Sequence, residues 1–222
     1  PATHEAARAS TERTLRWARS AFKHYRERQD REEAVRKQAC FPIVQGSMFP
    51  DLRRYCAEQL LELDAPGYAI GGLSVGEPRP LSMEMTEVTA PLLPADRPRY
   101  AMGVGMPDEL LEYVARGIDM MDCVLPSRNA RNGYFFTKTG RVIIKQAQYK
   151  DDASPVEENC SCYTCKNFSR GYLRHLFLAN EITFSTLATL HNLRRYLDIM
   201  REIRQAILVG NFPAYLRSVR GR

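Results

Sequence analysis

The sequence predicts an α/β protein built around a parallel β-sheet, and three observations support this fold class. Four short apolar runs occur at intervals of about 20 to 30 residues, each ends at a glycine or a polar residue, and helical patterns separate them. A repeated order of strand, turn and helix is typical of right-handed βα units, whose strands pair in parallel. The four runs are Phe41–Gln45, Gly67–Ile70, Arg99–Met102 and Ile118–Asp122.

Each predicted strand leads, at its carboxyl end, to a residue that could contact a ligand. These residues are Gln45, Gly72, Met102 and Asp122. Both (β/α)8 barrels and doubly wound sheets place their sites at the carboxyl ends of parallel strands, so the pattern by itself leaves both folds open. Four units are visible, which is half of an eight-stranded barrel.

Half a barrel would have two unpaired edges, at the Phe41 strand and at the Ile118 strand. We therefore expect apolar side chains such as Ile43, Ile70 and Met120 to face solvent unless another chain covers them.

The last run, Ile118–Asp122, also holds two acids, Asp119 and Asp122. Three residues apart in an extended chain, they point to opposite faces, so only one of them can enter a given site.

The remaining elements follow from helical and hairpin patterns. The first part of the chain has helical patterns at Ala2–Lys37, Pro50–Leu63 and Asp108–Arg116. After Leu125 we expect a basic loop at Pro126–Arg131, a β-hairpin formed by Gly133–Thr137 and Arg141–Lys145, and helices at Asn167–Leu178, Ile182–Val209 and Pro213–Val219. This change of pattern divides the chain into a domain at 1–125 and a second at 126–222.

Composition narrows the class of protein. The chain has 222 residues, 44% of them hydrophobic and 26% charged, which suits an ordinary globular core. No apolar run is long enough to span a membrane, and no signal peptide opens the sequence, so we expect a cytoplasmic protein. The net charge of +6 permits a polyanionic partner such as RNA without demanding one.

The strongest chemical signal is a cluster of cysteines. Cys160, Cys162 and Cys165 lie within six residues, and in a reducing compartment such spacing indicates metal ligation before disulfides. Three thiolates and one imidazole form the tetrahedral set that Zn²⁺ prefers, and a closed set of four ligands indicates a structural ion. His191 and His175 are both candidates for the fourth ligand. Unliganded thiols near a surface histidine are the simpler alternative.

Several motifs in a fixed order resemble the tRNA-guanine transglycosylase family of bacterial type, over essentially the whole chain. They are Val44–Gly46, Gly71–Glu77, Tyr100–Gly105, Gly117–Arg128 and the Cys-x-Cys-x-x-Cys cluster with its distant histidine. The resemblance implies the C-terminal half of a TIM (β/α)8 barrel with an inserted zinc-binding subdomain and C-terminal helices. It also implies an enzyme of queuosine biosynthesis, which exchanges the wobble guanine of tRNA for a queuosine precursor base.

The resemblance assigns roles to individual residues. Asp122, and not Asp119, matches the catalytic nucleophile, and His191, and not His175, matches the fourth ligand of one structural Zn²⁺ per chain. Residues that match the binding site for the base are Gln45, Gly72, Leu73, Glu77 and Met102, while Arg128 and Arg131 match contacts to the anticodon loop of tRNA. Val75 favours 7-aminomethyl-7-deazaguanine over queuine as the incoming base.

The family pattern begins before this chain does. The resemblance places a second acidic residue, an aromatic that stacks on the base and a base-reading aspartate in four earlier barrel strands, so we expect the chain to be inactive by itself. The family forms dimers through the zinc-subdomain region, which implies a homodimer. The alternative is a non-catalytic, zinc-containing tRNA-binding subunit, and Asp122 and the complete Gly71–Glu77 motif disfavour it. An isolated zinc-ribbon RNA-binding module would leave the four βα units unexplained.

Overall fold

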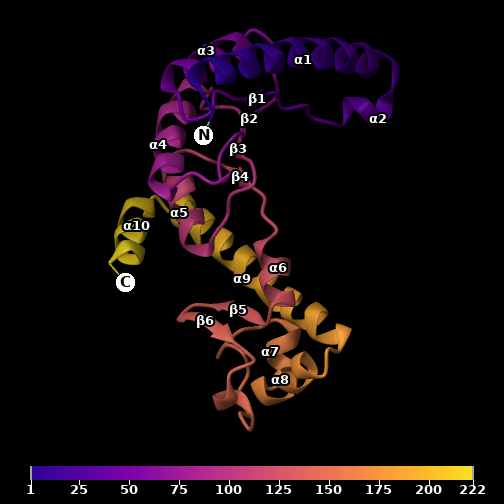
Figure 1. Ribbon diagram of the computed structural model, residues 1–222, viewed down its shortest axis with the longest axis vertical. Helices are drawn as coiled ribbons and strands as arrows, with labels where there is room; N and C mark the ends of the chain where they lie inside the picture. The colour runs from indigo at the N-terminus through magenta and orange to yellow at the C-terminus, as the bar shows by residue number, and fades with distance from the viewer. Residues whose placement is uncertain (1, 222) are drawn as a thin grey trace. The chain divides into compact units, whose positions relative to one another are not determined.

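The computed structural model describes residues 2–221 and contains two compact units, residues 1–122 and 123–222 (Figure 1). None of the helices between residues 2 and 221 is long and apolar enough to cross a lipid bilayer.

The first unit is built on a parallel sheet of four short strands. They are β1 (Ile43–Val44), β2 (Tyr68–Ile70), β3 (Arg99–Ala101) and β4 (Met120–Met121), hydrogen-bonded in the order of the sequence. Sequential order in a parallel sheet requires a crossover between each pair of neighbours, and helices supply the crossovers. The predicted α/β class and its parallel strands are therefore confirmed.

The outer strands of this sheet are edges. Among the described residues, no strand pairs with the free side of β1 or of β4. Met120 on β4 is 47% exposed, as predicted for an edge strand. The prediction for Ile70 is wrong, because this side chain is fully buried. Ile70 lies on the interior strand β2, and it belongs to the core that the crossover helices form over the sheet.

Four helical segments connect the strands or follow them. They are α3 (Pro50–Leu61), α4 (Arg79–Thr89), the short 3₁₀ turn η1 (Ala90–Leu92) and α5 (Pro107–Ala115). The sequence patterns predicted α3 and α5 but not α4. This helix contains Thr86 and Thr89, which disfavour helices, but both hydroxyls bond the carbonyl four residues earlier, at 2.8 and 2.6 Å.

The predicted N-terminal helix is interrupted near its end. α1 (His4–Arg31) begins at Thr3, whose hydroxyl accepts a bond from the Ala6 N–H, and Glu32 has extended backbone before α2 (Glu33–Arg36). The guanidinium of Arg28 bonds both carboxylate oxygens of Glu32, which holds the break at this residue. One continuous helix at Ala2–Lys37 was therefore a wrong prediction.

The second unit surrounds the predicted hairpin. Strands β5 (Tyr134–Thr137) and β6 (Gly140–Ile143) pair antiparallel, and the 3₁₀ turn η2 (Ala147–Tyr149) follows them. Four helices follow the hairpin in the chain: α7 (Tyr163–Asn167), α8 (Arg170–Leu178), α9 (Ile182–Leu208) and α10 (Phe212–Arg220). Phe135, Leu173 and Phe184 join hairpin, α8 and α9 in one buried core. The predicted start at Asn167 was wrong, because Ser169 caps a new helix there.

The predicted basic loop at Pro126–Arg131 is a helix, α6 (Leu125–Arg131). Pro126 lies in the first turn, where a backbone donor has no helical partner to lose. Asn129 donates its side-chain amide to the Leu125 carbonyl at 3.1 Å, and Ala130 is fully buried. Proline and asparagine favour a loop in the sequence, but here their positions within the turn support a helix.

Candidate active site and metal centre

The register of the sheet brings the predicted site residues of the first unit to one edge. Val44, Ile70, Ala101 and Met121 are partners across the four strands, one beside the next. The residues that follow them are Gln45, Gly71, Met102 and Asp122, so these four leave the sheet in a row at its carboxyl edge. Parallel strands place their loops at this edge, which is where such folds bind ligands.

Asp122 carries the carboxylate of this row. Its Oδ1 accepts a hydrogen bond from the Tyr100 hydroxyl at 2.5 Å and another from the Gly103 N–H at 2.9 Å. These two donors hold the pKa of Asp122 below its usual range, and the carboxylate in turn raises the pKa of Tyr100 to about 12. Asp122 is exposed, so an ionised carboxylate is presented at the strand ends.

Asp119 has a different role in the structure. Its Oδ2 accepts the backbone N–H of Arg99 at 2.9 Å, at the beginning of β3, and its own N–H donates to the Arg99 carbonyl. Asp119 therefore links the beginning of β3 to the beginning of β4. Asp122 lies at the exit of β4, so the two acids lie at opposite ends of this strand, and their orientation toward opposite faces stays a prediction.

The two glycines after β2 let Gln45 approach the backbone closely. A Cβ on Gly71 would lie 2.6 Å from Gln45 Nε2, and one on Gly72 would lie 2.8 Å from Gln45 Oε1. Gly72 also has a φ of +68°, which L side chains rarely adopt. A polar amide and bare backbone therefore lie side by side at the sheet edge, an arrangement that suits a flat ligand with a hydrogen-bonding edge.

Arg53 lies beneath this turn, and sequence reasoning missed it. Its side chain is fully buried, and it donates to the carbonyls of Ser47 at 2.7 Å and Gly71 at 3.1 Å. Burial lowers the pKa of Arg53 to about 10, and Nη1 has no hydrogen-bond partner among the described residues. A buried guanidinium held by two carbonyls fixes both loops at the strand ends. In the sequence, Arg53 is an ordinary member of the predicted helix, and no motif distinguishes it.

Leu73, Met102 and Glu77 surround the same loops. Leu73 is buried as a whole residue, and Met102 is half-buried directly after β3. Glu77 closes its own loop by accepting from the Ser74 N–H, the Ser82 hydroxyl and, at 2.9 Å, the Val75 N–H. Burial raises the pKa of Glu77, but these hydrogen bonds outweigh it and hold the pKa below its usual value.

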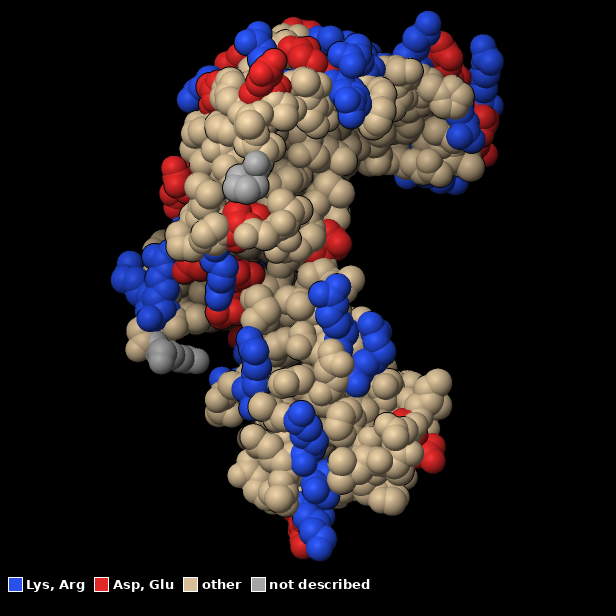
Figure 2. Space-filling view, in the orientation of Figure 1, with Lys and Arg blue, Asp and Glu red and all other residues tan. Residues whose placement is uncertain are grey.

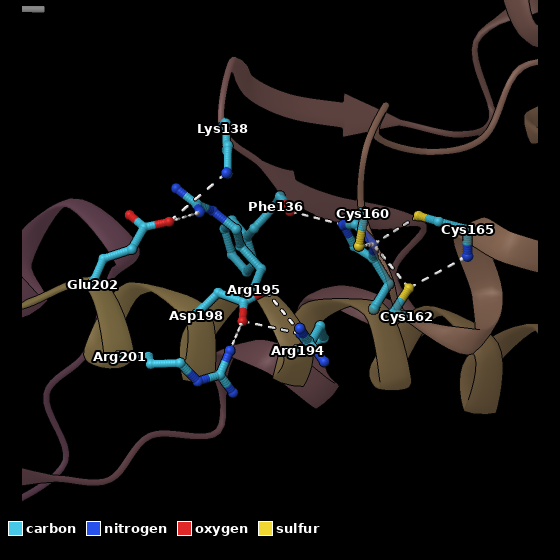
Figure 3. A network of polar contacts seen from close by, with 11 residues as sticks. Phe136, Lys138, Cys160, Cys162, Cys165, Arg194, Arg195, Asp198, Arg201 and Glu202 are labelled. Atoms are coloured by element: carbon cyan, nitrogen blue, oxygen red, sulfur yellow. Dashed lines mark hydrogen bonds and ion pairs between the residues drawn. The ribbon is translucent and has the colours of Figure 1, made fainter. Parts of the chain in front are cut away.

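The second unit presents the predicted arginines and the metal cluster. Arg128 and Arg131 are exposed on α6. Cys160, Cys162, Cys165 and His191 bring their ligand atoms within 4.8 Å of one another (Figure 3). Cys160 comes from the loop before α7, Cys162 caps that helix, Cys165 lies within it, and α9 supplies the histidine. The structure thus joins all four predicted ligands.

The distances in this cluster fit a tetrahedral zinc ion. The three sulfurs lie 3.8, 3.6 and 3.2 Å from Nδ1 of His191, in chain order. Ordinary Zn–S and Zn–N bonds in a tetrahedron separate sulfur from nitrogen by about 3.5 Å. The other ring nitrogen, Nε2, lies 2.9 Å from the Phe136 carbonyl, which directs Nδ1 toward the sulfurs. His175, the alternative ligand, is exposed on α8 and lies outside the cluster.

The close spacing of the three thiols also favours binding of a cation. A hydrogen bond from the Cys165 thiol lowers the pKa of Cys162 to about 3 and raises the pKa of Cys165 itself. Burial raises the pKa of Cys160. Three thiolates this close together would repel one another, and a bound cation would offset that repulsion.

These features define a class of protein: an α/β protein with a parallel sheet, an ionised aspartate at the carboxyl edge and a closed Cys₃His cluster that could hold a metal. The sequence model described as queuine tRNA-ribosyltransferase matches residues 1–222. The chain therefore belongs to the queuine tRNA-ribosyltransferase family.

Individual relatives agree with this assignment. The chain is 67% identical over 219 residues to a queuine tRNA-ribosyltransferase of Solibacter usitatus, covering 99% of this chain and 57% of the relative. It is 52% identical over 207 residues to that of Caldanaerobacter subterraneus, covering 93% and 53%, and 49% identical over 225 residues to that of Koribacter versatilis, covering 99% and 59%. The chain thus spans little more than half the length of these curated relatives.

Proposed function

We propose that this chain is part of a tRNA-guanine transglycosylase, which exchanges the wobble guanine of a tRNA for a 7-deazaguanine base in queuosine biosynthesis. The observation that carries the proposal is the Asp122 carboxylate, which Tyr100 and Gly103 keep ionised at the strand ends, in the same row as Gln45 and the Gly71–Gly72 turn. Membership of the family supplies the reaction class.

The chemistry is a double displacement at C1′ of the ribose. A carboxylate oxygen of Asp122 attacks C1′, and the bond from C1′ to the guanine nitrogen breaks with its electron pair leaving on the base. The incoming base then loses its N9 proton, attacks C1′ and displaces the carboxylate. Two inversions restore the original configuration, as in retaining glycosidases. Removal of the proton requires a general base, which we place outside this chain.

The remaining residues of the row hold the heterocycle. Gln45 and the N–H of Gly72 donate to its O6, Met102 provides an apolar floor, and the Leu73 carbonyl accepts from a 7-aminomethyl group. Glu77 sets the shape of the loop around that substituent, since it ties Ser74 and Val75 to Ser82. We propose 7-aminomethyl-7-deazaguanine as the incoming base, because Val75 occupies the position where queuine-using relatives carry a smaller residue.

In the same proposal, the sheet is the second half of a (β/α)8 barrel. The unpaired edges of β1 and β4 support this inference, because a closed barrel would pair each of them with a further strand.

The proposal also includes the second unit, where one structural Zn²⁺ occupies the Cys₃His cluster. A homodimer forms through the zinc-subdomain region, where Tyr172 and Phe168 stack with ring centroids 5.5 Å apart and Tyr172 is 46% exposed. No disulfide forms among the described cysteines, which suits a reducing cytoplasm.

The test is base exchange by the full-length protein carrying Asp122→Asn, with Asp119→Asn as the matched control. We expect Asp122→Asn to abolish incorporation of labelled guanine into tRNA and to remove the denaturant-stable RNA adduct, while tRNA affinity changes little. Asp119→Asn should retain the adduct. An adduct that persists in Asp122→Asn would assign the nucleophile elsewhere, and a wild-type protein that binds tRNA without exchange would favour a non-catalytic accessory subunit.

A further inference from the structure

Arg53 is a buried cation that no carboxylate neutralises by contact. Its side chain is fully buried, and among residues 2–221 it forms hydrogen bonds to carbonyls but no ion pair. Glu77 attracts Arg53 electrostatically, but the Glu77 carboxylate bonds the N–H groups of Ser74 and Val75 and the Ser82 hydroxyl instead. The full positive charge of the guanidinium therefore acts on the loops around it.

Exposed cations of the same unit differ from Arg53, because they lie beside acids. Arg28 pairs with Glu32 at 2.7 Å, and Arg19 lies 3.9 Å from Glu62. Figure 2 shows Lys and Arg side chains among Asp and Glu side chains over α1 and α3. Water screens such surface pairs, whereas burial of an unpaired charge is costly. This cost indicates that Arg53 serves the site at the strand ends more than the stability of α3.

The contact of Arg53 with Gly71 falls at the peptide where the chain leaves the sheet. The Gly71 N–H still donates to the Val44 carbonyl at 3.0 Å, as a continuation of the parallel ladder. The Gly71 carbonyl instead accepts from Nη2 of Arg53 at 3.1 Å. The peptide between Gly71 and Gly72 is thus the first of this turn whose orientation is set by a side chain.

This bond also determines the direction of the next amide. The carbonyl of Gly71 and the N–H of Gly72 belong to one trans peptide plane and point in opposite directions. With the carbonyl held by Arg53, the Gly72 N–H points away from the guanidinium. It donates to no other group between residues 2 and 221, and Gly72 is half-buried at the sheet edge beside Gln45. A cation on the carbonyl also polarises the peptide, which makes the N–H a stronger donor.

We propose that Arg53 is a positioning residue for base exchange, which acts through the Gly71–Gly72 peptide: it directs the Gly72 N–H at O6 of the base and strengthens that hydrogen bond as guanine departs. The inference rests on the proposed function and deepens it. When the bond from C1′ to the guanine nitrogen breaks, the electron pair stays on the base and its negative charge spreads onto O6. A fixed donor backed by a buried cation stabilises this charged state more than the neutral base.

The experiment compares binding of two free bases to full-length wild type, Arg53→Met, Arg53→Lys and Arg54→Met. Guanine has the O6 carbonyl, whereas 2-aminopurine has a hydrogen in its place. We expect Arg53→Met to bind guanine about 10-fold more weakly and 2-aminopurine with less than about 2-fold change. Arg53→Lys keeps the charge and should give an intermediate affinity for guanine. Arg54 is exposed on the same helix, so Arg54→Met should match wild type for both bases.

A kinetic readout follows the charged state itself. In a single turnover with saturating tRNA, formation of the covalent adduct should be about 100-fold slower in Arg53→Met, while the KM for tRNA is unchanged. Arg53→Lys should recover part of this rate. A purely structural support would instead affect both bases alike and would not distinguish lysine from methionine by charge.

Several outcomes would overturn the proposal. They are an equal loss of affinity for guanine and 2-aminopurine in Arg53→Met, folded Arg53→Lys protein that is as slow as Arg53→Met, and failure of both variants to fold by circular dichroism. If Arg53→Met alone does not fold, the comparison of the two bases is made with Arg53→Lys, and an undiminished preference for guanine contradicts the proposal. Wild-type protein that prefers guanine through Arg53 but forms no adduct with tRNA would refute the enzymatic proposal alone.

Discussion

The hydroxyl of Tyr100 donates to Oδ1 of Asp122 across 2.5 Å, and the register of the sheet explains the contact. Tyr100 on β3 is paired with Met120 on β4, and Asp122 lies two residues beyond Met120. Side chains two residues apart share a face of a strand, so a long phenol reaches forward to the carboxylate. The strand pairing thereby sets the ionisation of the proposed nucleophile.

Tyr100→Phe should shift the acid limb of the exchange reaction to higher pH. The Tyr100 hydroxyl is the main cause that holds the pKa of Asp122 below its usual range, so wild-type activity should persist as pH falls until that lowered pKa is reached. Without the donor, the carboxylate takes up its proton at higher pH and activity is lost earlier. A pH profile of kcat measures the shift, with Tyr55→Phe as control. Superimposable profiles would contradict this role for Tyr100.

Arg53→Met should weaken binding of the base by about 10-fold, because the loss of a charged hydrogen-bond donor frees the Ser47 and Gly71 carbonyls that shape the strand-end loops. Binding of tRNA through the second unit should not change. The control is Arg54→Met on the same helix, since Arg54 is exposed. Calorimetric titration with guanine gives the affinities. Equal affinities for the two variants would show that Arg53 is dispensable to the site.

Cys162→Ser should eliminate bound zinc and unfold the second unit. Structural zinc contributes on the order of 10 kcal/mol to the folding of small domains, and this unit has one described cluster that could hold the ion. Metal analysis should find about one zinc per wild-type chain and none in the variant. Cys40→Ser, which changes a half-buried thiol of the first unit, should retain the metal. Zinc-free wild-type protein, purified without chelator and still folded, would disprove the site.

Asn192→Ala should loosen α6 and β5 without removing a charge. Asn192 is fully buried, accepts from the Phe136 N–H at 2.9 Å and donates to the carbonyls of Pro126 and Tyr134, both at 3.0 Å. Leaving these backbone groups unpaired costs about 1 to 3 kcal/mol each. We expect faster hydrogen exchange in α6 and β5 and a lower Tm. Asn167→Ala, an exposed amide on α7, is the control, and matching exchange rates in both variants would refute the bracing role.

The sequence predicted those features that depend on local patterns. Apolar runs and glycine turns gave the four parallel strands, and cysteine spacing gave three ligands of the metal cluster. Arg53 could not be predicted, because its importance arises from contacts with the loops after two different strands. Similarly, α6 was missed because Pro126 and Asn129 are read as loop residues until their places in a helical turn are known.

His191 and Asn192 are adjacent on α9, and they connect two parts of the second unit that are distant in the sequence, the cysteine cluster and α6. The first faces the cysteines and bonds the Phe136 carbonyl, and the second bonds the Phe136 N–H and the first turn of α6. One peptide bond thus separates the metal ligand from the residue that braces α6. If the cluster holds zinc as proposed, a cell short of zinc would make chains whose α6 is loosely held, so the proposed contacts of Arg128 and Arg131 with tRNA would weaken together with the metal centre.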